Sequence, residues 1–392
     1  MRAARGSWSC CSVSAIRSGI SRRGESVTPY APAGRRAGAS RGTAPRNALT
    51  TGVTARTPTG TDIARAAELI YDGRVVGMPT ETVYGLAANA FDEEAVIEIF
   101  EVKQRPAFDP LIVHLSGARG LSEVARLNDL SEEVRAQVEL LTTRFWPGPL
   151  TLVLPKVDDL PDVVTSGLDT VAVRVPAHPM ARALIVVAGV PLAAPSANPF
   201  GYVSPTTAQH VADQLGSKVP YVLDGGECGV GVESTILAPP RAGVSEAWTV
   251  LRDGGLTREV LEEALGVTLV DGTVTDGAPA KPAAPGQLAS HYAPRTPLRH
   301  GPLDQLLREA RAQQPDAKLH VIAFRSVPPG LRGEGLAPNG DLRVAARALF
   351  AAMRRADQAG ADLILAERVP DEGLGRAIND RLRRASVPAV LS

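Results

Sequence analysis

Apolar positions recur along this chain with two different spacings, and their alternation predicts the order of helices and strands. Apolar residues three or four positions apart predict helices over residues 62–72, 93–103 and 131–145. Short apolar runs predict strands over residues 75–78, 111–115, 150–156, 170–175, 191–195, 221–224, 234–238 and 248–252. Strands that alternate with helices predict one large α/β domain over residues 58–266.

A second, smaller domain is predicted over residues 296–392. The segment before it, residues 267–295, is expected to be a linker without regular structure, because it is rich in Pro, Ala and Gly. In the second domain, predicted helices over 303–313, 341–358 and 374–384 alternate with predicted strands over 296–299, 318–324, 362–367 and 389–391. This order predicts a parallel sheet of Rossmann-like layout, although the chain has no Gly-x-Gly-x-x-Gly fingerprint for a dinucleotide.

Polar side chains collect where the predicted elements end between residues 79 and 115. A polar loop, residues 80–85, follows the first strand, and Lys103 and Arg105 occupy the polar end of a helix that Pro106 stops. A residue that precedes proline favours extended geometry, so the two cations are able to converge on one anion. The competing interpretation is a solvated helix end whose cations complement the helix dipole.

Two loops after apolar strands supply hydroxyl groups. Ser196 follows the strand at 191–195, and Ser204 precedes a helix expected to begin near Thr206, where it acts either as a ligand contact or as a helix cap. A glycine-rich turn, residues 224–235, permits close backbone approach to a ligand. The chain has no Gly-x-x-x-x-Gly-Lys-Ser/Thr sequence, so a nucleotide would be bound without a P-loop.

Three further residues lie in apolar surroundings that are costly for polar groups. Arg174 lies in an otherwise apolar strand, where its guanidinium needs either a ligand carboxylate or a structural acid. Arg252 has the same two interpretations, because Asp253 is adjacent. His114 ends the strand at 111–115 and is, by itself, more typical of a hydrogen-bonded core histidine. We find no Ser-His-Asp set in the sequence, so these residues favour charge stabilisation over covalent catalysis.

Composition narrows the expected partners. Lys plus Arg and Asp plus Glu both number 42, so net charge gives no reason to expect a nucleic-acid or membrane partner. The cysteines, Cys10, Cys11 and Cys228, show no metal spacing and are too few for a disulfide framework, which fits a reducing, cytoplasmic location. No apolar run approaches the length of a membrane span.

Residues 1–57 differ from the rest of the chain, because arginine is frequent there and Glu25 is the single acid. This composition predicts a disordered N-terminal extension. An organellar transit peptide is the alternative interpretation.

From residue 61 onward, ordered blocks of sequence make the chain similar to the Sua5/YrdC family in its long Sua5 form. The blocks are residues 79–86 (Pro-Thr-Glu-Thr-Val-Tyr-Gly-Leu), 103–106, 146–151, 194–198, 231–236, 251–252, 285–286 and 291–294. The resemblance implies a twisted, open YrdC-like α/β domain followed by a smaller Rossmann-like Sua5 C-terminal domain. It also implies an L-threonylcarbamoyladenylate synthase, a nucleotidyltransferase that forms threonylcarbamoyl-AMP and diphosphate from L-threonine, bicarbonate or CO2, and ATP.

The resemblance also implies which residues contact the substrates. L-threonine is expected to contact Thr82, His114, Arg174, Ala194 and Ser234, with Arg174 as the carboxylate clamp. ATP is expected to contact Lys103, Arg105, Thr170, Ser196, Ser204 and Arg252. Asp109 is a weaker ATP candidate, because the family often has Asn there. As the threonine carbamate attacks the α-phosphorus, Lys103, Arg105 and the Mg2+ that accompanies ATP are expected to stabilise charge.

The product is expected to pass to a separate transferase complex that makes N6-threonylcarbamoyladenosine at position 37 of tRNA. In the linker, the aromatic residue that reaches back to ATP in the family is replaced by Ala289, so gating by the linker would depend on His291 or Tyr292. Weak RNA binding is an alternative function, against which the neutral charge and scarce aromatics argue. Carbamoyl transfer is a third, and the chain lacks the zinc-finger spacing expected for it.

Overall fold

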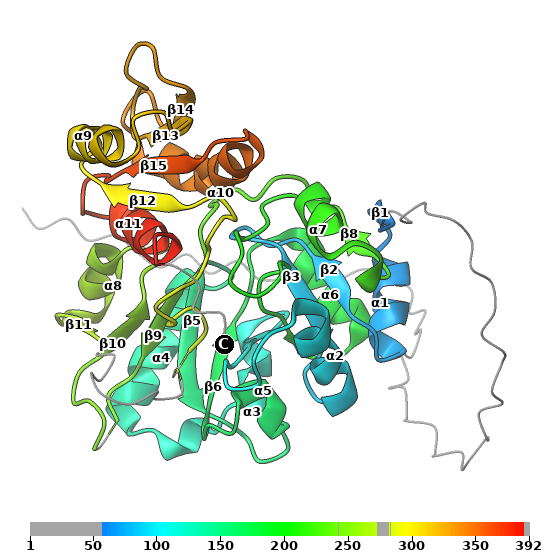
Figure 1. The fold of residues 1–392 in the computed structure, drawn as a ribbon. Coiled ribbons are helices and arrows are strands. Elements are labelled where there is room, and N and C mark those ends of the chain that lie inside the picture. The colour runs from blue at the N-terminus through cyan, green and yellow to red at the C-terminus, as the bar shows by residue number, and fades with distance from the viewer. Residues whose placement is uncertain (1–56, 242, 273–281, 283, 388–392) are drawn as a thin grey trace, which may run out of the picture. The chain divides into compact units, whose positions relative to one another are not determined.

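The structure, a computed structural model, describes residues 57–387 apart from residues 242, 273–281 and 283 (Figure 1). All the described residues belong to one compact unit. The predicted N-terminal extension, apart from its last residue, and the strand predicted at 389–391 lie outside the described residues. Among the helices of the described part, none is long and apolar enough to cross a membrane.

Within the described residues, the larger sheet is open and mixed, with eleven strands in the order β1-β8-β2-β3-β7-β4-β6-β5-β9-β10-β11. Its strands are β1 (Thr59–Gly60), β2 (Val76–Met78), β3 (Gly85–Asn89), β4 (Ile112–His114), β5 (Leu150–Pro155), β6 (Thr170–Arg174), β7 (Leu192–Ala193), β8 (Val222–Leu223), β9 (Thr235–Ala238), β10 (Thr249–Arg252) and β11 (Val270–Asp271). At its centre β4 runs parallel to β6 and antiparallel to β7. The predicted open α/β architecture is confirmed.

Helices pack their apolar stripes against this sheet, and side-chain caps fix where several of them begin. They are α1 (Ile63–Tyr71), α2 (Glu93–Lys103), α3 (Leu121–Val124), α4 (Glu132–Phe145), α5 (Asp162–Thr165), α6 (Pro179–Ala188), α7 (Ala208–Leu215) and α8 (Arg258–Leu265). Asp92 caps α2 by accepting from the amide of Ala95, and Ser131 caps α4 in the same way. The helices predicted at 62–72, 93–103 and 131–145 are therefore confirmed.

The smaller sheet is parallel throughout, with strand order β12-β15-β13-β14 (Figure 1, yellow to red). Its elements are β12 (Leu298–Gly301), α9 (Leu303–Gln313), β13 (Leu319–Ala323), β14 (Gly333–Gly335), α10 (Leu342–Gln358), β15 (Leu363–Glu367) and α11 (Leu374–Ala385). This agrees with the predicted small Rossmann-like domain.

Four strands were not predicted from the sequence, namely β1, β3, β11 and β14. β3 begins at Gly85, the last residue of the predicted polar loop; although alanine and glycine disfavour strands, its backbone pairs with β2 on one side and β7 on the other. β11 lies inside the segment expected to lack regular structure, where Val270 pairs with Thr249 of β10. In both places pairing with a neighbouring strand outweighs the local preference of the residues.

Candidate active site

A buried cavity lies at the C-terminal ends of β4 and β6. His114 ends β4 and Arg174 ends β6, and the parallel register pairs these two residues directly. The loops after β2, α2 and β7, the loop before β9, the end of β10 and the linker supply most of the rest of the lining. The predicted residues that line the cavity are Thr82, Arg105, His114, Arg174, Ala194, Ser196, Ser234 and Arg252. Of the other predicted residues, Lys103, Asp109, Thr170 and Ser204 are not part of the lining.

Arg174 has the structural acid that one of its two interpretations requires, and the ligand interpretation stays a prediction. Its Nη2 atom lies 2.5 Å from Oε1 of Glu81, and its Nη1 atom donates to Oγ1 of Thr82 at 3.0 Å. The side chain is buried but lines the cavity, and its Nε atom has no hydrogen-bond partner among the described residues. A guanidinium with an unused N–H donor is suited to a ligand carboxylate.

His114 is at once a core histidine and part of the cavity wall. It is only 3% exposed, and its Nδ1 atom lies 3.1 Å from the carbonyl oxygen of Ile112. Burial, with a smaller effect from the charge of Arg174, lowers the pKa of His114 to about 3. The imidazole is therefore neutral near pH 7 and adds no positive charge beside Arg174.

Lys103 and Arg105 are 1% and 7% exposed, so the solvated interpretation of this helix end is wrong. α2 ends at Lys103, and Gln104 has a left-handed φ of 55°, which turns the chain. The Lys103 ammonium donates to the carbonyl oxygens of Ser196, at 2.6 Å, and Asn198. Burial, and then the charge of Arg105, lowers the pKa of Lys103 well below its usual value. In its protonated form Lys103 has three N–H donors, of which the two carbonyl oxygens accept two and one is left for a ligand.

Arg105 contacts different partners from Lys103. Its Nη2 atom lies 2.8 Å from Oδ2 of Asp109 and donates to the carbonyl oxygen of Pro110 at 2.9 Å. Asp109 is fully buried, and burial raises its pKa while the charge of Arg105 opposes that rise. Asp109 therefore balances the charge of Arg105 rather than facing the cavity.

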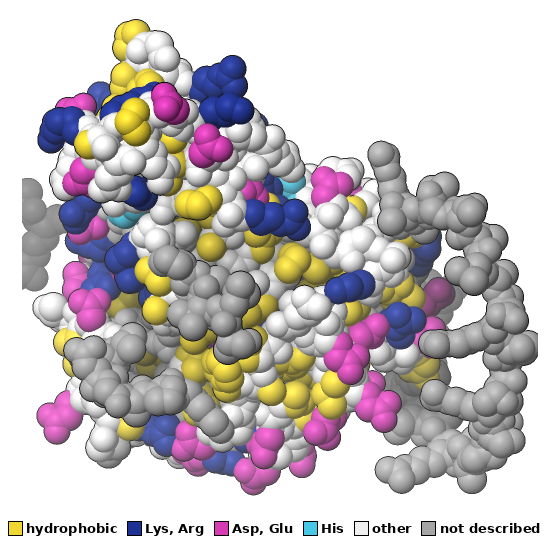
Figure 2. Space-filling view, viewed as in Figure 1, with side chains coloured by type: hydrophobic (Ala, Val, Ile, Leu, Met, Phe, Trp, Pro, Cys, Tyr) yellow, Lys and Arg dark blue, Asp and Glu magenta, His cyan; other side chains and the backbone are white. Residues whose placement is uncertain are grey.

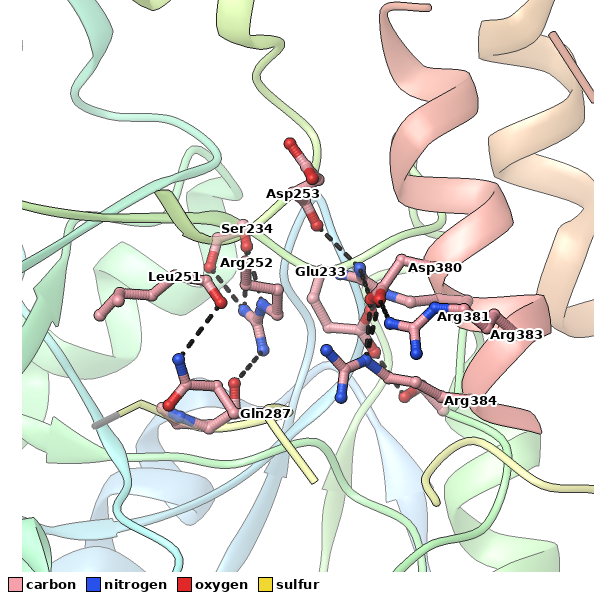
Figure 3. Close-up of polar contacts among 12 residues, drawn as sticks. Glu233, Ser234, Leu251, Arg252, Asp253, Gln287, Asp380, Arg381, Arg383 and Arg384 are labelled. Atoms are coloured by element: carbon pink, nitrogen blue, oxygen red, sulfur yellow. Dashed lines mark hydrogen bonds and ion pairs between the residues drawn. The ribbon is translucent and has the colours of Figure 1, made fainter. Parts of the chain in front are cut away.

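Arg252 joins the sheet to the linker (Figure 3). Its Nε and Nη2 atoms donate to the carbonyl oxygen of Ser234 at 3.1 and 2.9 Å, and its Nη1 atom donates to the carbonyl oxygen of Pro285 at 3.3 Å. Asp253 instead pairs with Arg258, whose Nε atom lies 2.7 Å from Oδ1. The interpretation in which Arg252 pairs with the adjacent Asp253 is therefore wrong.

Ser204 and Thr170 lie away from the cavity for different reasons. Ser204 is fully buried and donates to Oε1 of Glu233 at 2.6 Å. It is therefore connected to the cavity only indirectly, by its hydrogen bond to a residue of the lining. It does not cap the next helix, because α7 begins after Thr207, whose side chain accepts from the amide of His210. Thr170 begins β6 whereas Arg174 ends it, which separates their backbones by about 13 Å at the usual rise per residue.

The linker covers one side of the cavity. Pro285, Gly286, His291 and Tyr292 line it, whereas Ala289 is not part of the lining. Gly286 has φ of 80°, and a Cβ atom there would lie 2.8 Å from the Tyr292 hydroxyl. His291 and Tyr292 are both buried, and their rings meet edge to face with centroids 4.1 Å apart. The contact expected from His291 or Tyr292 is thus available despite Ala289.

Two acidic residues of the site, Glu81 and Glu233, were not predicted from the sequence. Glu81 binds Arg174 and also accepts from the amide of Ala177 at 3.0 Å. Glu233 lines the cavity and is 6% exposed. The available signal was an acid placed between Val232 and Ser234, where the chain enters a buried strand. The resulting cavity has hydroxyls, a neutral histidine and several guanidinium groups, which suits an anionic or zwitterionic ligand.

Two protein-family models match this chain, one over most of the larger domain and one over the smaller domain. A family model for Sua5, YciO and YrdC proteins, described as "Telomere recombination", matches residues 68–254. A second model, described as "Threonylcarbamoyl-AMP synthase, C-terminal domain", matches residues 256–387.

Individual proteins that are similar to this chain are named threonylcarbamoyl-AMP synthase. A threonylcarbamoyl-AMP synthase of Pyrococcus abyssi is 43% identical over 332 residues, which cover 82% of this chain and 93% of that protein. One from Bacillus subtilis is 40% identical and covers 83% of this chain and 92% of that protein. A crystal structure of P. abyssi Sua5 complexed with L-threonine is 41% identical, with a TM-score of 0.75, and covers 84% of this chain and 97% of that chain.

Proposed function

The chain belongs to the Sua5/YrdC family of threonylcarbamoyl-AMP synthases, and we propose that its buried cavity is where L-threonine meets the reacting end of ATP. The chain is therefore an enzyme that forms threonylcarbamoyl-AMP. The observation that carries the proposed location is a buried arginine, Arg174, with an unused donor in a cavity that also has a neutral histidine and two threonine hydroxyls.

Threonine is proposed to bind at the ends of β4 and β6. Its carboxylate accepts from Arg174, whose geometry is already fixed by Glu81 and Thr82. Ser234, whose hydroxyl lies 2.7 Å from that of Thr151, supplies a second polar contact, and His114 and Ala194 complete the pocket. Since P. abyssi Sua5 binds L-threonine and shares 41% of aligned residues, the same ligand is the simplest choice for this cavity.

ATP is proposed to approach from the side of Arg105, Ser196 and Arg252. Burial lowers the pKa of Arg252, but guanidinium groups stay charged near pH 7 and attract phosphate oxygens. Lys103 orders the Ser196 loop and has one donor left for the attacked phosphate. The described residues contain no group of three or more His, Cys, Asp or Glu arranged for a metal. Mg2+ is proposed to enter as part of the ATP substrate.

The proposed chemistry needs no protein nucleophile. The threonine amine forms an N–C bond with CO2, derived from bicarbonate, and loses a proton to give a carbamate. A carbamate oxygen then bonds to the α-phosphorus of ATP, and the bond to the β-phosphate bridging oxygen breaks to release diphosphate. The cavity contributes by holding the two reactants in line and by offsetting charge on the phosphate.

The product is a mixed anhydride, which transfers its acyl group readily and releases AMP. We propose that a separate transferase acting on tRNA consumes it in the cytoplasm. Direct RNA binding has less support. On the face drawn in Figure 2, positive and negative side chains are interspersed, without a large basic patch among the residues described.

Product analysis with labelled bicarbonate, threonine and ATP tests this proposal. We expect one product that contains the threonine carbon skeleton, the bicarbonate carbon and the AMP moiety, with diphosphate released in equal amount. Omitting threonine or bicarbonate should remove both signals. Diphosphate release that is independent of threonine, or RNA binding without turnover, would contradict the proposal.

A further inference from the structure

One wall of the cavity is held by the smaller domain rather than by its own sheet. Glu233, in the loop before β9, accepts from Nε of Arg381 at 2.9 Å, although the two residues lie 148 positions apart in the sequence (Figure 3). Arg381 is on α11 and is 0% exposed. A buried guanidinium must be paired, because an uncompensated buried charge is costly.

Arg381 contacts three parts of the chain that form the cavity wall. Besides Glu233, its Nη1 atom donates to the carbonyl oxygen of Asp253 at 2.7 Å, next to the cavity residue Arg252. Its guanidinium lies 5.3 Å from the ring centroid of the cavity residue Tyr292. Burial acts to lower the pKa of Arg381, but its acidic and phenolic neighbours raise it above the usual value. One side chain thus joins the loop, the end of β10 and the linker.

Packing supports the same wall. Val83, Val203, Val232 and Tyr292 belong to a hydrophobic core whose other buried members all come from the smaller domain, within residues 298–385. Gly231 approaches α10 so closely that a Cβ atom would lie 2.4 Å from Cα of Arg347. The loops that carry Thr82, Ser204 and Glu233 are therefore packed against α10 and α11.

Two further polar contacts of α11 reach the linker. Arg384 donates to the carbonyl oxygen of Leu288, and the amide of His291 donates to the carbonyl oxygen of Arg384 at 3.3 Å. Asp380 lies 3.2 Å from Nη1 of Arg381 and 3.0 Å from Nε of Arg384. The same helix turn therefore contacts the Glu233 loop and the linker segment above the cavity.

We propose that Arg381 is a positioning residue for the nucleotide half of the site. It fixes the position of the Glu233 carboxylate and offsets its charge, and Glu233 in turn orients Ser204. This inference rests on the proposed function, since it takes ATP as the ligand beside Glu233. It also gives the smaller domain a task in the reaction, which is to supply the counter-charge for a carboxylate in the cavity.

The charge argument sets the expected kinetic effect. Without Arg381, Glu233 remains as an unpaired acid in a cavity that receives a polyphosphate, so ATP binding weakens by electrostatic repulsion. Threonine, whose carboxylate is proposed to bind Arg174, is affected less. Changing Glu233 to Gln in the same protein removes the repelling charge and should recover part of the ATP affinity.

The test is steady-state kinetics on full-length Arg381→Met, Glu233→Gln and the double variant, with Arg383→Ala as the matched control. Arg383 is on the same helix turn and pairs with Asp380, but its side chain is 58% exposed. We expect Arg381→Met to raise the KM for ATP at least tenfold and the KM for threonine less than threefold. The double variant should have a lower KM for ATP than Arg381→Met, and Arg383→Ala should resemble wild type.

Three results would overturn the inference. They are an unchanged KM for ATP in folded Arg381→Met, an equal rise in both KM values, or a double variant no better than Arg381→Met. Thermal unfolding establishes that each variant is folded, and Arg381→Gln replaces the Met variant under the same criteria if Met prevents folding. Failure of the proposed function is distinguished by the wild type, which would then show no diphosphate release dependent on threonine and bicarbonate.

Discussion

Two walls of the cavity are built in different ways. The sheet wall is defined as the lining residues Arg105, His114 and Arg174 together with Lys103, which lies behind the lining and donates to the carbonyl oxygen of the lining residue Ser196. It is held within the larger domain, and Arg105 finds its partners only four and five residues away. The domain wall, defined as Glu233, Ser234, His291 and Tyr292, has Glu233, His291 and Tyr292 in contact with α11 of the smaller domain. The difference predicts that the two walls fail differently: damage to the sheet wall removes ligand contacts, whereas damage to the domain wall misplaces them.

The largest effect is expected from breaking the sheet wall at Lys103. Lys103→Ala removes the cation that is proposed to contact the attacked phosphate and leaves the carbonyls of Ser196 and Asn198 without their donor. Loss of one such charge-stabilising donor typically costs about 100-fold to 1,000-fold in rate, and we expect a fall of that size in threonine-dependent diphosphate release. Lys218→Ala, at an exposed position of the same domain, should leave the rate unchanged. Activity within a few-fold of wild type in Lys103→Ala would remove Lys103 from the site.

The domain wall is broken most directly at Gly231. Gly231 and Gly226 both have φ of 81°, but only at Gly231 would a Cβ atom meet another segment, 2.4 Å from Cα of Arg347. Gly226→Ala should therefore cost about 1 kcal/mol in unfolding free energy from backbone strain alone. Gly231→Ala adds overpacking against α10 and should cost about 3 kcal/mol. Urea denaturation measures both variants, and equal losses would contradict the close contact of the two domains.

The pH dependence of the unfolding free energy tests how His114 is held in the sheet wall. Its pKa is about 3 when folded and about 6.5 when unfolded, so between these values the unfolded chain binds more protons. The stability contributed by neutral His114 is therefore present above pH 6.5 and decreases as pH falls towards 3. When the pH falls from 6.5 to 4.5, the unfolding free energy of the wild type should therefore decrease by about 2 to 3 kcal/mol more than that of His114→Asn. Parallel stability curves for the two proteins would show that His114 titrates normally.

The smallest effect is expected from changing the shape of a cation while keeping its charge. Arg174→Lys cannot maintain bonds to Glu81 and Thr82 and also present a fork to a carboxylate. We expect the KM for threonine to rise about tenfold, with little change in the KM for ATP. Arg182→Lys, at an exposed position on α6, is the control. If the KM for ATP rises instead, threonine does not bind at the end of β6.

Most elements of the fold could be predicted from the sequence because their signals are local. Asp92 and Ser131 cap helices whose apolar stripes were visible, and the runs at 150–156 and 170–175 form paired central strands. β3 could not be predicted, since its alanines favour a strand only after β2 and β7 pair with it. The same reason explains β11, which depends on β10 for its pairing.

Within the candidate site, predictions from neighbouring residues failed where a distant partner was stronger. Asp253 stands beside Arg252 in the sequence but pairs with Arg258, while Arg252 binds the Ser234 backbone. Ser204 has the residue type of a helix cap but donates to Glu233. A strand or helix directs adjacent side chains to different sides, so adjacency alone does not establish a pair.

The sequence by itself determined the alternation of helices and strands, the polar loops at strand ends and, by resemblance, the family. These follow from periodicity, capping and ordered motifs, which act over a few residues. Only the tertiary structure decided that Lys103 and Arg105 are buried, that His114 and Arg174 meet at one cavity, and that Arg381 pairs with Glu233. The burial and pairing of charges could not be read from the sequence, because they depend on which distant segments exclude water from a side chain. Packing alone fixes those segments.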